Sequence, residues 1–401
     1  MEPLFYLAWI AIISQLIFMI GMVRNFKYTL TRIKKTRDEY CPATALIVPC
    51  KGIDPAFDKN IASFYAQDYN NYSLLFVVEA ASDPAYQSLC LLKEKLSPAS
   101  KAKQVQILVA GLSNSSSQKI HNLLYAYKNI PPQTEVLAFA DSDACIKNYW
   151  LKYIVHPLSK PKYGASSGYR WFVPQKSNLA TLALSALNAK IAQLLGNTRF
   201  NQPWGGSMAI KVDTFKNIGL EKIWSNALSD DYSLGYAVKK AKLIVAFVPY
   251  CLVASYETTT WPKLFEFARR QYLITKVYVP GTWAFALFSG IYSVLCLWGG
   301  LVLTIRSLLS DHKYLFTFAA LTAVFYLCQL ARSFLRQTMI RILLKNDRSR
   351  LTSAMIADIV ASPFFSILML ALILSSAFGR TIKWRGIKYK LVSPEQTIRL
   401  K

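Results

Sequence analysis

The 401-residue sequence contains few acidic residues and few charged residues of either sign. Asp and Glu together number 22 against 47 Lys and Arg, giving a net charge of +25, and charged residues form 17% of the chain. Typical soluble proteins are roughly 25% charged. Hydrophobic residues form 53% of the chain, which excludes intrinsic disorder. Such a composition is typical of a membrane protein that faces anionic lipids or anionic ligands, and we expect no nucleic-acid partner.

The sequence also lacks the motifs of several common sites. Its seven cysteines are widely spaced and form no CxxC pair, so neither a disulfide framework nor a zinc site is indicated. The GxGxxG and P-loop patterns are absent, which argues against dinucleotide binding and P-loop NTPase chemistry. The three histidines have no ligand spacing, and we assign them no catalytic role.

The first long apolar segment predicts a membrane anchor. Residues 3–23 carry no charge and are about long enough to cross a bilayer core of roughly 30 Å. Basic residues follow this run rather than precede it, and no small-residue cleavage site lies behind it, so we expect a retained anchor over 1–25. The bias of basic residues toward the cytosolic side places the basic linker, 26–43, and the chain after it in the cytosol.

Further apolar segments near the C-terminus predict a multi-pass integral membrane protein. Residues 284–305 and 314–331 are uncharged, and 354–379 is apolar except for Asp358. We therefore expect transmembrane helices over 284–379, then a basic tail over 380–401. The last segment either crosses the bilayer or is broken, at Asp358 or Pro363, into a re-entrant or interfacial piece, and charge alone leaves both alternatives open.

Two other segments indicate contact with a lipid surface. Residues 256–283 contain aromatic side chains interleaved with basic ones just before an apolar run, which is typical of an amphipathic interfacial segment. Residues 178–199 are apolar and nearly free of acids. That second segment is either an interfacial helix beside a lipid substrate or an ordinary core helix.

The region 44–255 has the pattern of an α/β domain. Short apolar runs at 44–49, 74–79, 105–110 and 135–140 alternate with helical stretches. This alternation predicts a mostly parallel sheet covered by helices. Ligands in such folds bind beyond the carboxyl ends of the strands, so the polar residues that follow each run are the candidates for a site.

The most specific candidates are Asp141 and Asp143, which directly follow the apolar run at 135–140. Two carboxylates at a strand end can share one divalent cation, Mg²⁺ or Mn²⁺, together with the diphosphate that it carries. The alternative is a pair of turn residues, because Asp is common in turns. Asp83 follows another predicted strand and is expected at the same edge of the sheet.

For each of the other candidate site residues, a purely structural role is an alternative to a functional one. Asp230 and Asp231 precede an amphipathic stretch, where Asp231 is either a general base or, with its neighbour, part of a helix cap. Arg270 either faces a diphosphate leaving group or extends to the membrane surface. The Trp204-Gly205-Gly206 loop either lets the backbone approach a ligand or is only a turn. Lys119 either faces a donor molecule or is solvated.

The order of these motifs resembles a known enzyme family. Over about residues 40–285 the sequence resembles membrane-bound glycosyltransferases of the family 2 type with a GT-A fold, and within them the ceramide glucosyltransferase branch, family 21. The motifs that carry the resemblance, in chain order, are Lys51-Gly52-Ile53-Asp54-Pro55, Gln67-Asp68-Tyr69, Asp83-Pro84-Ala85, Lys119-Ile120-His121-Asn122-Leu123, Asp141-Ser142-Asp143, Gly205-Gly206-Ser207-Met208, Asp230-Asp231-Tyr232 and Arg269-Arg270-Gln271-Tyr272.

The resemblance implies an inverting, metal-dependent transfer of a hexose from a nucleotide sugar, UDP-glucose first among the UDP-hexoses, to a membrane lipid hydroxyl. It implies that Asp83 contacts the nucleotide, that Asp141 and Asp143 hold the metal, and that Asp231 is the catalytic base with Arg270 beside it. The remaining roles that it implies are donor binding by Lys51 and Lys119, and an acceptor side formed by Trp204, Gly205, Gly206, Asp230 and Gln271.

One departure from the family pattern bears on the acceptor. The family motif (Q/R)XXRW reads here Phe267-Ala268-Arg269-Arg270-Gln271, which keeps the arginine and loses both outer residues. This argues against a processive polysaccharide synthase, which is the first alternative function. The second alternative is a non-catalytic membrane scaffold with a transferase-like domain. That alternative predicts the loss of Asp141, Asp143 or Asp231, and all three are present.

Overall fold

The computed structural model describes residues 2–33, 39–54, 56–113, 115–384 and 387–400. The chain divides into two compact units. The first, here the helical unit, comprises Met1–Leu30, Phe172–Gly196 and Tyr256–Gly379. The second, here the α/β unit, comprises Thr31–Trp171, Asn197–Ser255 and Arg380–Lys401. Residues 34–38 of the predicted basic linker lie outside the described residues.

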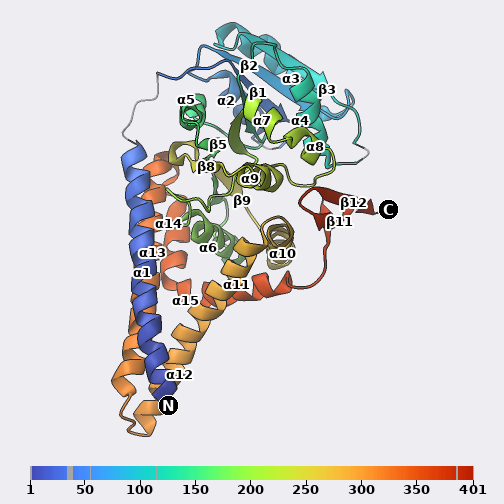
Figure 1. The fold of residues 1–401 in the computed structure, drawn as a ribbon. Helices are drawn as coiled ribbons and strands as arrows, with labels where there is room; N and C mark the ends of the chain where they lie inside the picture. The colour runs from blue at the N-terminus through green and yellow to red at the C-terminus, as the bar shows by residue number, and fades with distance from the viewer. Residues whose placement is uncertain (1, 34–38, 55, 114, 385–386, 401) are drawn as a thin grey trace. The chain divides into compact units, whose positions relative to one another are not determined.

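The main sheet of the α/β unit confirms the predicted α/β fold class. Its strand order is β3-β2-β1-β4-β7-β5-β8 (Figure 1). Neighbouring strands are parallel except where β7 pairs antiparallel with β4 and β5. The strands are β1 (Thr44–Pro49), β2 (Tyr72–Val78), β3 (Gln104–Val109), β4 (Val136–Ala140), β5 (Tyr163–Ser167), β7 (Ser207–Lys211) and β8 (Ile244–Phe247).

Helices cover both faces of this sheet because successive strand residues point to opposite faces. One face packs against α2 (Phe57–Tyr65), α3 (Pro84–Leu96) and α5 (Trp150–Val155). The other packs against α4 (Gln118–Lys128), α7 (Val212–Asn217), α8 (Leu220–Trp224) and α9 (Asp230–Lys240). Short 3₁₀ turns η1 (Ser97–Ala99), η2 (His156–Ser159) and η3 (Pro249–Cys251) complete the unit.

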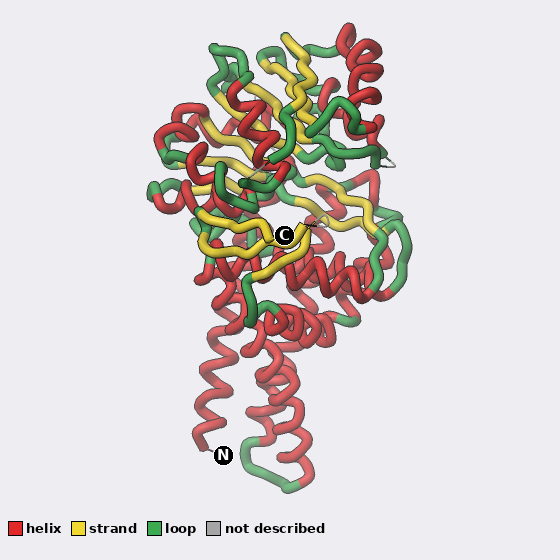
Figure 2. The backbone as a smooth tube through the Cα atoms, turned by 90° about the vertical axis from the view of Figure 1, so that its right-hand side faces the viewer, coloured by secondary structure: helices red, strands yellow, loops and turns green. Residues whose placement is uncertain are grey.

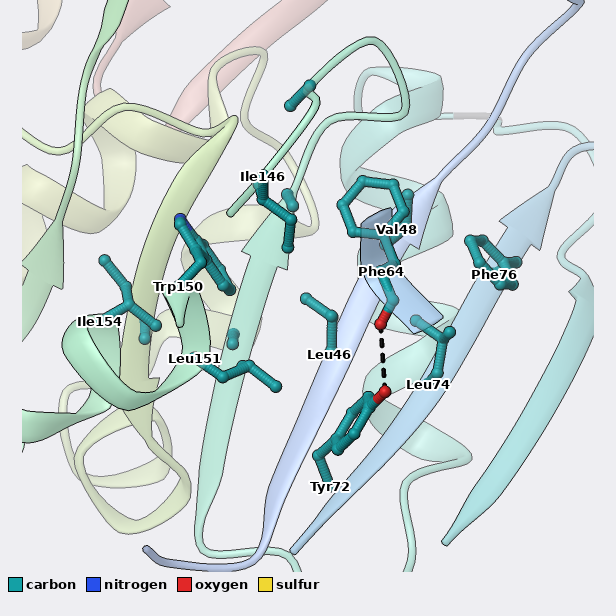
Figure 3. Packing of buried hydrophobic residues seen from close by; sticks show 14 of the residues in the cluster. Leu46, Val48, Phe64, Tyr72, Leu74, Phe76, Ile146, Trp150, Leu151 and Ile154 are labelled. Atoms are coloured by element: carbon teal, nitrogen blue, oxygen red, sulfur yellow. Dashed lines mark hydrogen bonds between the residues drawn. The ribbon is translucent and has the colours of Figure 1, made fainter. Parts of the chain in front are cut away.

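Figure 3 shows the core on the first of these faces. Leu46 and Val48 of β1 alternate with residues of the opposite core, and Phe64 of α2 and Trp150 of α5 pack over them. The Tyr72 hydroxyl donates a hydrogen bond to the Phe64 carbonyl at 3.1 Å. Strands β1, β2 and β4 are buried along nearly their whole length, so this part of the sheet is a rigid support for the loops that follow it.

The C-terminal residues form a sheet within the α/β unit, where the sequence predicted only a basic tail. The order is β10 (Thr381–Trp384), β11 (Ile387–Ser393), β12 (Gln396–Leu400), all antiparallel. The Thr397 amide donates to the Asn226 carbonyl at 2.9 Å, and Lys240 Nζ lies 2.9 Å from Glu395 Oε1. The β11–β12 hairpin is therefore held against the α8–α9 region of this unit by Glu395 and Thr397.

Two further strands, β6 (Arg170–Pro174) and β9 (Val253–Glu257), form a two-stranded sheet.

The helical unit is built almost wholly from helices (Figure 2). In chain order these are α1 (Glu2–Ile33), α6 (Leu179–Ala192), α10 (Trp261–Tyr278), α11 (Pro280–Val294), the π-helical η4 (Leu295–Gly299), α12 (Gly300–Leu309), α13 (Leu315–Leu343), η5 (Lys345–Asp347), α14 (Leu351–Val360) and α15 (Ser362–Ser375).

The helical unit contains the apolar helices that the sequence predicted. Among the described residues, Glu2–Arg32, Pro280–Leu309 and Leu315–Leu343 are long and apolar enough to cross a membrane. The first extends beyond the predicted anchor, 1–25, because no proline or glycine interrupts the chain between residue 22 and residue 33. Ala8, Ala11 and Ile12 of α1 pack in one buried cluster with residues of η4 and α13.

The fourth apolar segment, 354–379, is broken into two helices, which is one of the two alternatives that the sequence left open. Helices α14 and α15 meet at an angle of 87° at Ala361, between Asp358 and Pro363. Pro363 lies in the first turn of α15, where a missing N–H costs no hydrogen bond. Helix α6 packs against this bent pair, and most of its side chains are buried, as the core-helix alternative for 178–199 predicts.

Asp358 is fully buried in the helical unit and pairs with Arg336 of α13. Arg336 Nε donates to one carboxylate oxygen at 2.6 Å, and Nη2 donates to the other. Gln337 also donates to Asp358, at 2.8 Å, and Arg336 donates to Gln193 at 3.1 Å. This network neutralises the one acidic residue of the segment at the point where the helix breaks.

Candidate active site

The candidate site lies at the carboxyl edge of the main sheet. The parallel strands β1, β2 and β4 end at the same edge, and Asp141 follows β4 directly. The carbonyl of Asp141 accepts a hydrogen bond from Ala144 at 3.0 Å, so residues 141–144 form a tight turn. A buried apolar strand that ends in this turn holds both aspartates at the edge.

Lys119 joins two carboxylates from different elements. Ser117 caps α4 by accepting from the Ile120 amide, which places Lys119 in the first turn. Its Nζ lies 2.7 Å from Asp141 Oδ1 and 2.9 Å from Asp230 Oδ2. Burial alone would lower the pKa of Lys119, but the charges of Asp141 and Asp230 raise it above its ordinary value. The lysine is therefore a fixed positive charge.

The two acids at the start of α9 have different surroundings. Ser229 is the N-cap of this helix, so neither Asp230 nor Asp231 is needed for that role. Asp230 is 4% exposed, and burial raises its pKa although Lys119 opposes the shift. Asp231 is partly exposed and accepts hydrogen bonds from the amides of Tyr232 at 2.7 Å and Gly205 at 3.2 Å. Of the pair, Asp231 is the one that a substrate can reach.

The predicted glycine loop lies against the same carboxylates. The register Ala140↔Ser207 between β4 and β7 brings Gly206 beside the residue that follows β4. A Cβ atom at Gly206 would lie 2.8 Å from Asp141 Oδ2, and one at Gly205 would lie 2.3 Å from Asp230 Oδ2. Only glycine allows the backbone to approach the acids this closely.

Trp204, which precedes the two glycines, contacts Ser167 and Arg170. Its amide donates to the Ser167 hydroxyl at 2.9 Å, and the guanidinium of Arg170 lies 5.7 Å from the centre of its ring. The structure thus brings Trp204, Gly205 and Gly206 next to the predicted metal and base residues.

Two residues near Asp143 were missed by the sequence reasoning. Asp143 remains solvent-accessible; partial desolvation and the negative charge of Asp141 raise its pKa, Asp54 adds to the shift, and Arg170 opposes it. Asp54 belongs to the first of the family motifs, but the resemblance implies no role for it. Arg170 belongs to no motif, and no local signal in the sequence distinguishes it.

The mutual repulsion of Asp141 and Asp143 fits a cation site. Among the described residues no group of three or more His, Cys, Asp and Glu could hold a metal ion. The candidate ligands are thus the two carboxylates of Asp141 and Asp143. Two carboxylates suit Mg²⁺ or Mn²⁺, because these ions are commonly held by one or two carboxylates together with substrate phosphates.

The donor-side predictions Asp83 and Lys51 lie at the ends of β2 and β1. Asp83 caps α3, accepting from Ala85 at 2.9 Å, and it also accepts from the Gly52 amide at 2.9 Å. It therefore joins the loops that follow the two strands. Lys51 Nζ pairs with Glu79 at 2.7 Å and is 46% exposed. Both side chains are at the expected edge.

Arg270 and Gln271 lie on α10, in the helical unit. The Arg270 guanidinium lies 5.6 Å from the centre of the Phe267 ring, the residue that replaces the first position of the family motif. The Gln271 carbonyl accepts a hydrogen bond from the Thr275 hydroxyl at 2.8 Å. Their roles at the leaving group and the acceptor stay predictions.

Comparisons with known proteins agree with the sequence resemblance. A curated relative, ceramide glucosyltransferase 3 of Caenorhabditis elegans, is 32% identical over 104 residues, which are 26% of this chain and 21% of that protein. The matched segment thus spans only about a fifth of the length of the relative.

Two solved structures are similar at low sequence identity. Mannosyltransferase PcManGT from Pyrobaculum calidifontis, in complex with GDP-Man and Mn²⁺, gives a TM-score of 0.45 at 14% identity, with 92% of this chain and 97% of that chain covered. GalNAc-T7 with UDP, GalNAc and Mn²⁺ gives 0.42 at 12% identity, with 63% and 51% covered.

The family comparison covers nearly the whole sequence. The model of glycosyl transferase family 21 matches residues 5–397, which include both units and the site at the sheet edge. The chain belongs to glycosyl transferase family 21 and is a glycosyltransferase.

Proposed function

We propose that this glycosyltransferase moves a hexose from a UDP-sugar, with UDP-glucose as the first candidate, to a hydroxyl group of a ceramide-like membrane lipid, with inversion at the anomeric carbon. The observation that carries the proposal is the convergence of Asp141, Lys119 and Asp231 at one sheet edge. The name of the curated relative supports the choice of glucose and ceramide.

The donor occupies the edge formed by the β1, β2 and β4 ends. Asp83 and the Gly52 loop lie where the nucleotide would bind, and Asp141 and Asp143 lie where the diphosphate would bind. A divalent cation held by Asp141 and Asp143 would bind the diphosphate and stabilise the charge that develops as UDP leaves. Lys119 and Arg170 add positive charge around the same carboxylates.

Asp231 supplies the base. Its Oδ1 accepts from Tyr232 and Ser229, whereas Oδ2 accepts from Gly205 and retains a lone pair. This oxygen removes the proton of the acceptor hydroxyl as the hydroxyl oxygen bonds to the anomeric carbon and the bond to the diphosphate breaks. UDP leaves with the electron pair, and attack from the face opposite UDP inverts the configuration. Asp230 is excluded from this role because it is buried against Lys119.

The lipid acceptor fits the arrangement of the chain. The α/β unit carries the site, and candidate membrane spans precede and follow it in sequence. Helix α10 has exposed Trp261 and Phe265, which we assign to the interface between bilayer and water. A water-soluble donor and a membrane-embedded acceptor can then meet at one site.

Removal of divalent cations tests the metal part of this proposal. Transfer should stop in EDTA and resume with Mn²⁺ or Mg²⁺. Replacing Asp143 by Asn should raise the Mn²⁺ concentration that gives half-maximal transfer by at least the roughly 10–100-fold that loss of an outer-shell partner costs. Full activity of the wild-type enzyme in EDTA would contradict it. Asp68→Asn, an acid paired with Lys101 and Lys152, is the control that should leave the metal requirement unchanged.

We also propose that the α/β unit is cytosolic and that the C-terminus lies on the same, cytosolic side of the membrane. Strands β10, β11 and β12 belong to the α/β unit, and α1, α11–α12 and α13 account for three crossings. The bent pair α14–α15 must then enter and leave the bilayer on one side. We infer that it is re-entrant.

Glycosylation mapping tests this topology. An N-glycosylation acceptor inserted between α12 and α13, at residues 310–314, should be modified in the endoplasmic reticulum, whereas one added after Lys401 should remain unmodified. Modification of the C-terminal acceptor would show that the bent pair crosses the membrane and that the basic tail is not cytosolic.

A further inference from the structure

Lys119 occupies the oxygen that a donor-bound cation would need. Its Nζ lies 2.7 Å from Asp141 Oδ1, and its side chain is only about one-fifth exposed, at 21%. A divalent cation and an ammonium group repel each other and compete for the same carboxylate. The donor diphosphate, in contrast, attracts both. The ion pair between Lys119 and Asp141 is therefore more stable when no donor and cation are bound.

Asp230 anchors the lysine from the other side. The Asp230 side chain is 6% exposed, and Lys119 is the cation within reach of it at 2.9 Å. A buried carboxylate without a partner is costly, so this half of the bridge should persist when the other half is lost. Asp230 is followed directly by Asp231 in the first turn of α9.

Gly205 shows how tightly this arrangement is packed. A Cβ atom there would lie 2.3 Å from Asp230 Oδ2 and 2.7 Å from Lys119 Nζ. The Gly205 amide also donates to Asp231 at 3.2 Å. The lysine, the buried acid and the base therefore all pack against Gly205, and a shift of one affects the others.

We propose that Lys119 is a positioning residue that links donor binding to helix α9, which carries the base Asp231. This inference rests on the proposed function. Without donor it bridges Asp141 and Asp230. When the cation and UDP moiety bind, Lys119 keeps Asp230 and exchanges Asp141 for a phosphate oxygen of the donor. No covalent bond changes in this step, since one ion pair replaces another.

Binding of the metal ion should depend on UDP even when no sugar is transferred. Because Lys119 holds Asp141 when no phosphate is present, Mn²⁺ alone should bind weakly. UDP should strengthen Mn²⁺ binding by drawing Lys119 away, by about 5–150-fold, the usual range of coupling between two sites. Removing the lysine should make Mn²⁺ binding less dependent on UDP.

Binding of Mn²⁺ to the purified full-length protein in detergent, followed by electron paramagnetic resonance with and without UDP, tests this. The variant is Lys119→Met combined with Asp230→Asn, which removes the ion pair without leaving a buried charge. We expect it to bind Mn²⁺ alone more tightly than the wild type does and to lose most of the effect of UDP. Thermal unfolding checks that the variant is folded.

Lys128→Met combined with Glu221→Gln is the matched control. Lys128 lies at the other end of α4, is 66% exposed and is 3.9 Å from Glu221. This pair of changes removes one cation and one acid, as the test variant does, so the net charge stays the same and the bridge is untouched. The control should bind Mn²⁺ as the wild type does. Weaker or unchanged Mn²⁺ binding by the folded double variant would overturn the proposal. Absence of any Mn²⁺ binding by the wild type with UDP would instead refute the proposed donor site itself.

Discussion

Replacing Asp231 by Asn should lower the turnover number of sugar transfer by roughly 10²–10⁴-fold, the usual contribution of a general base. The amide keeps an oxygen that can accept from Tyr232 and Ser229, so α9 should begin as it does in the wild type. It has no lone pair basic enough to remove the acceptor proton. Binding of UDP should change little, because Lys119 pairs with Asp141 and Asp230 rather than with Asp231.

Turnover at saturating donor, together with calorimetric titration of UDP, measures both quantities. Asp213→Asn is the control, since Asp213 is an exposed acid in the first turn of α7 and its loss should leave turnover unchanged. An Asp231→Asn enzyme that transfers sugar at nearly the wild-type rate would remove Asp231 from the role of base.

Removing one partner of the Arg336–Asp358 pair should destabilise the helical unit more than removing both. Asp358→Leu leaves a guanidinium buried without its carboxylate, which costs about 3–5 kcal/mol. Arg336→Met combined with Asp358→Leu leaves neither charge, and an apolar pair of similar volume often performs as well as a buried ion pair. Most of the stability lost in the single variant should therefore return in the double variant.

Thermal unfolding of the three proteins in detergent gives the order of stability. Lys345→Met removes an exposed cation just after α13 and should not change the midpoint. A double variant as unstable as Asp358→Leu would show that the pair does more than neutralise charge. In that case the hydrogen bonds to Gln337 and Gln193 would be what holds the bend between α14 and α15.

Residues that follow a strand were predictable from the sequence alone. The apolar run before Asp141 and the alternation of strands and helices are local patterns, and they place Asp83 and Asp141 at one edge without knowledge of the strand order. The position of the glycine loop was not predictable in this way. It depends on β7 pairing antiparallel with β4, a long-range contact that carries no local signal.

Ion pairs between distant segments were equally hidden. Hydropathy shows Asp358 as a single charge in an apolar segment, and nothing local indicates that Arg336, 22 residues earlier, neutralises it. The bridge from Lys119 to Asp230 likewise requires two helices that only the folded sheet brings together. The C-terminal strands have the composition of a basic tail because lysines dominate it, although Tyr389 and Leu391 alternate with these lysines and are buried.

The most direct test of the proposed function is lipid extraction after membranes containing the protein are incubated with labelled UDP-glucose, UDP-galactose or UDP-N-acetylglucosamine. We expect label in the organic phase with UDP-glucose, lost in EDTA and in the Asp231→Asn enzyme, on a glycolipid that mass spectrometry identifies as a glucosylated sphingolipid. Metal-dependent label in insoluble polymer, or no label in either fraction from any of the three donors, would contradict a lipid glucosyltransferase.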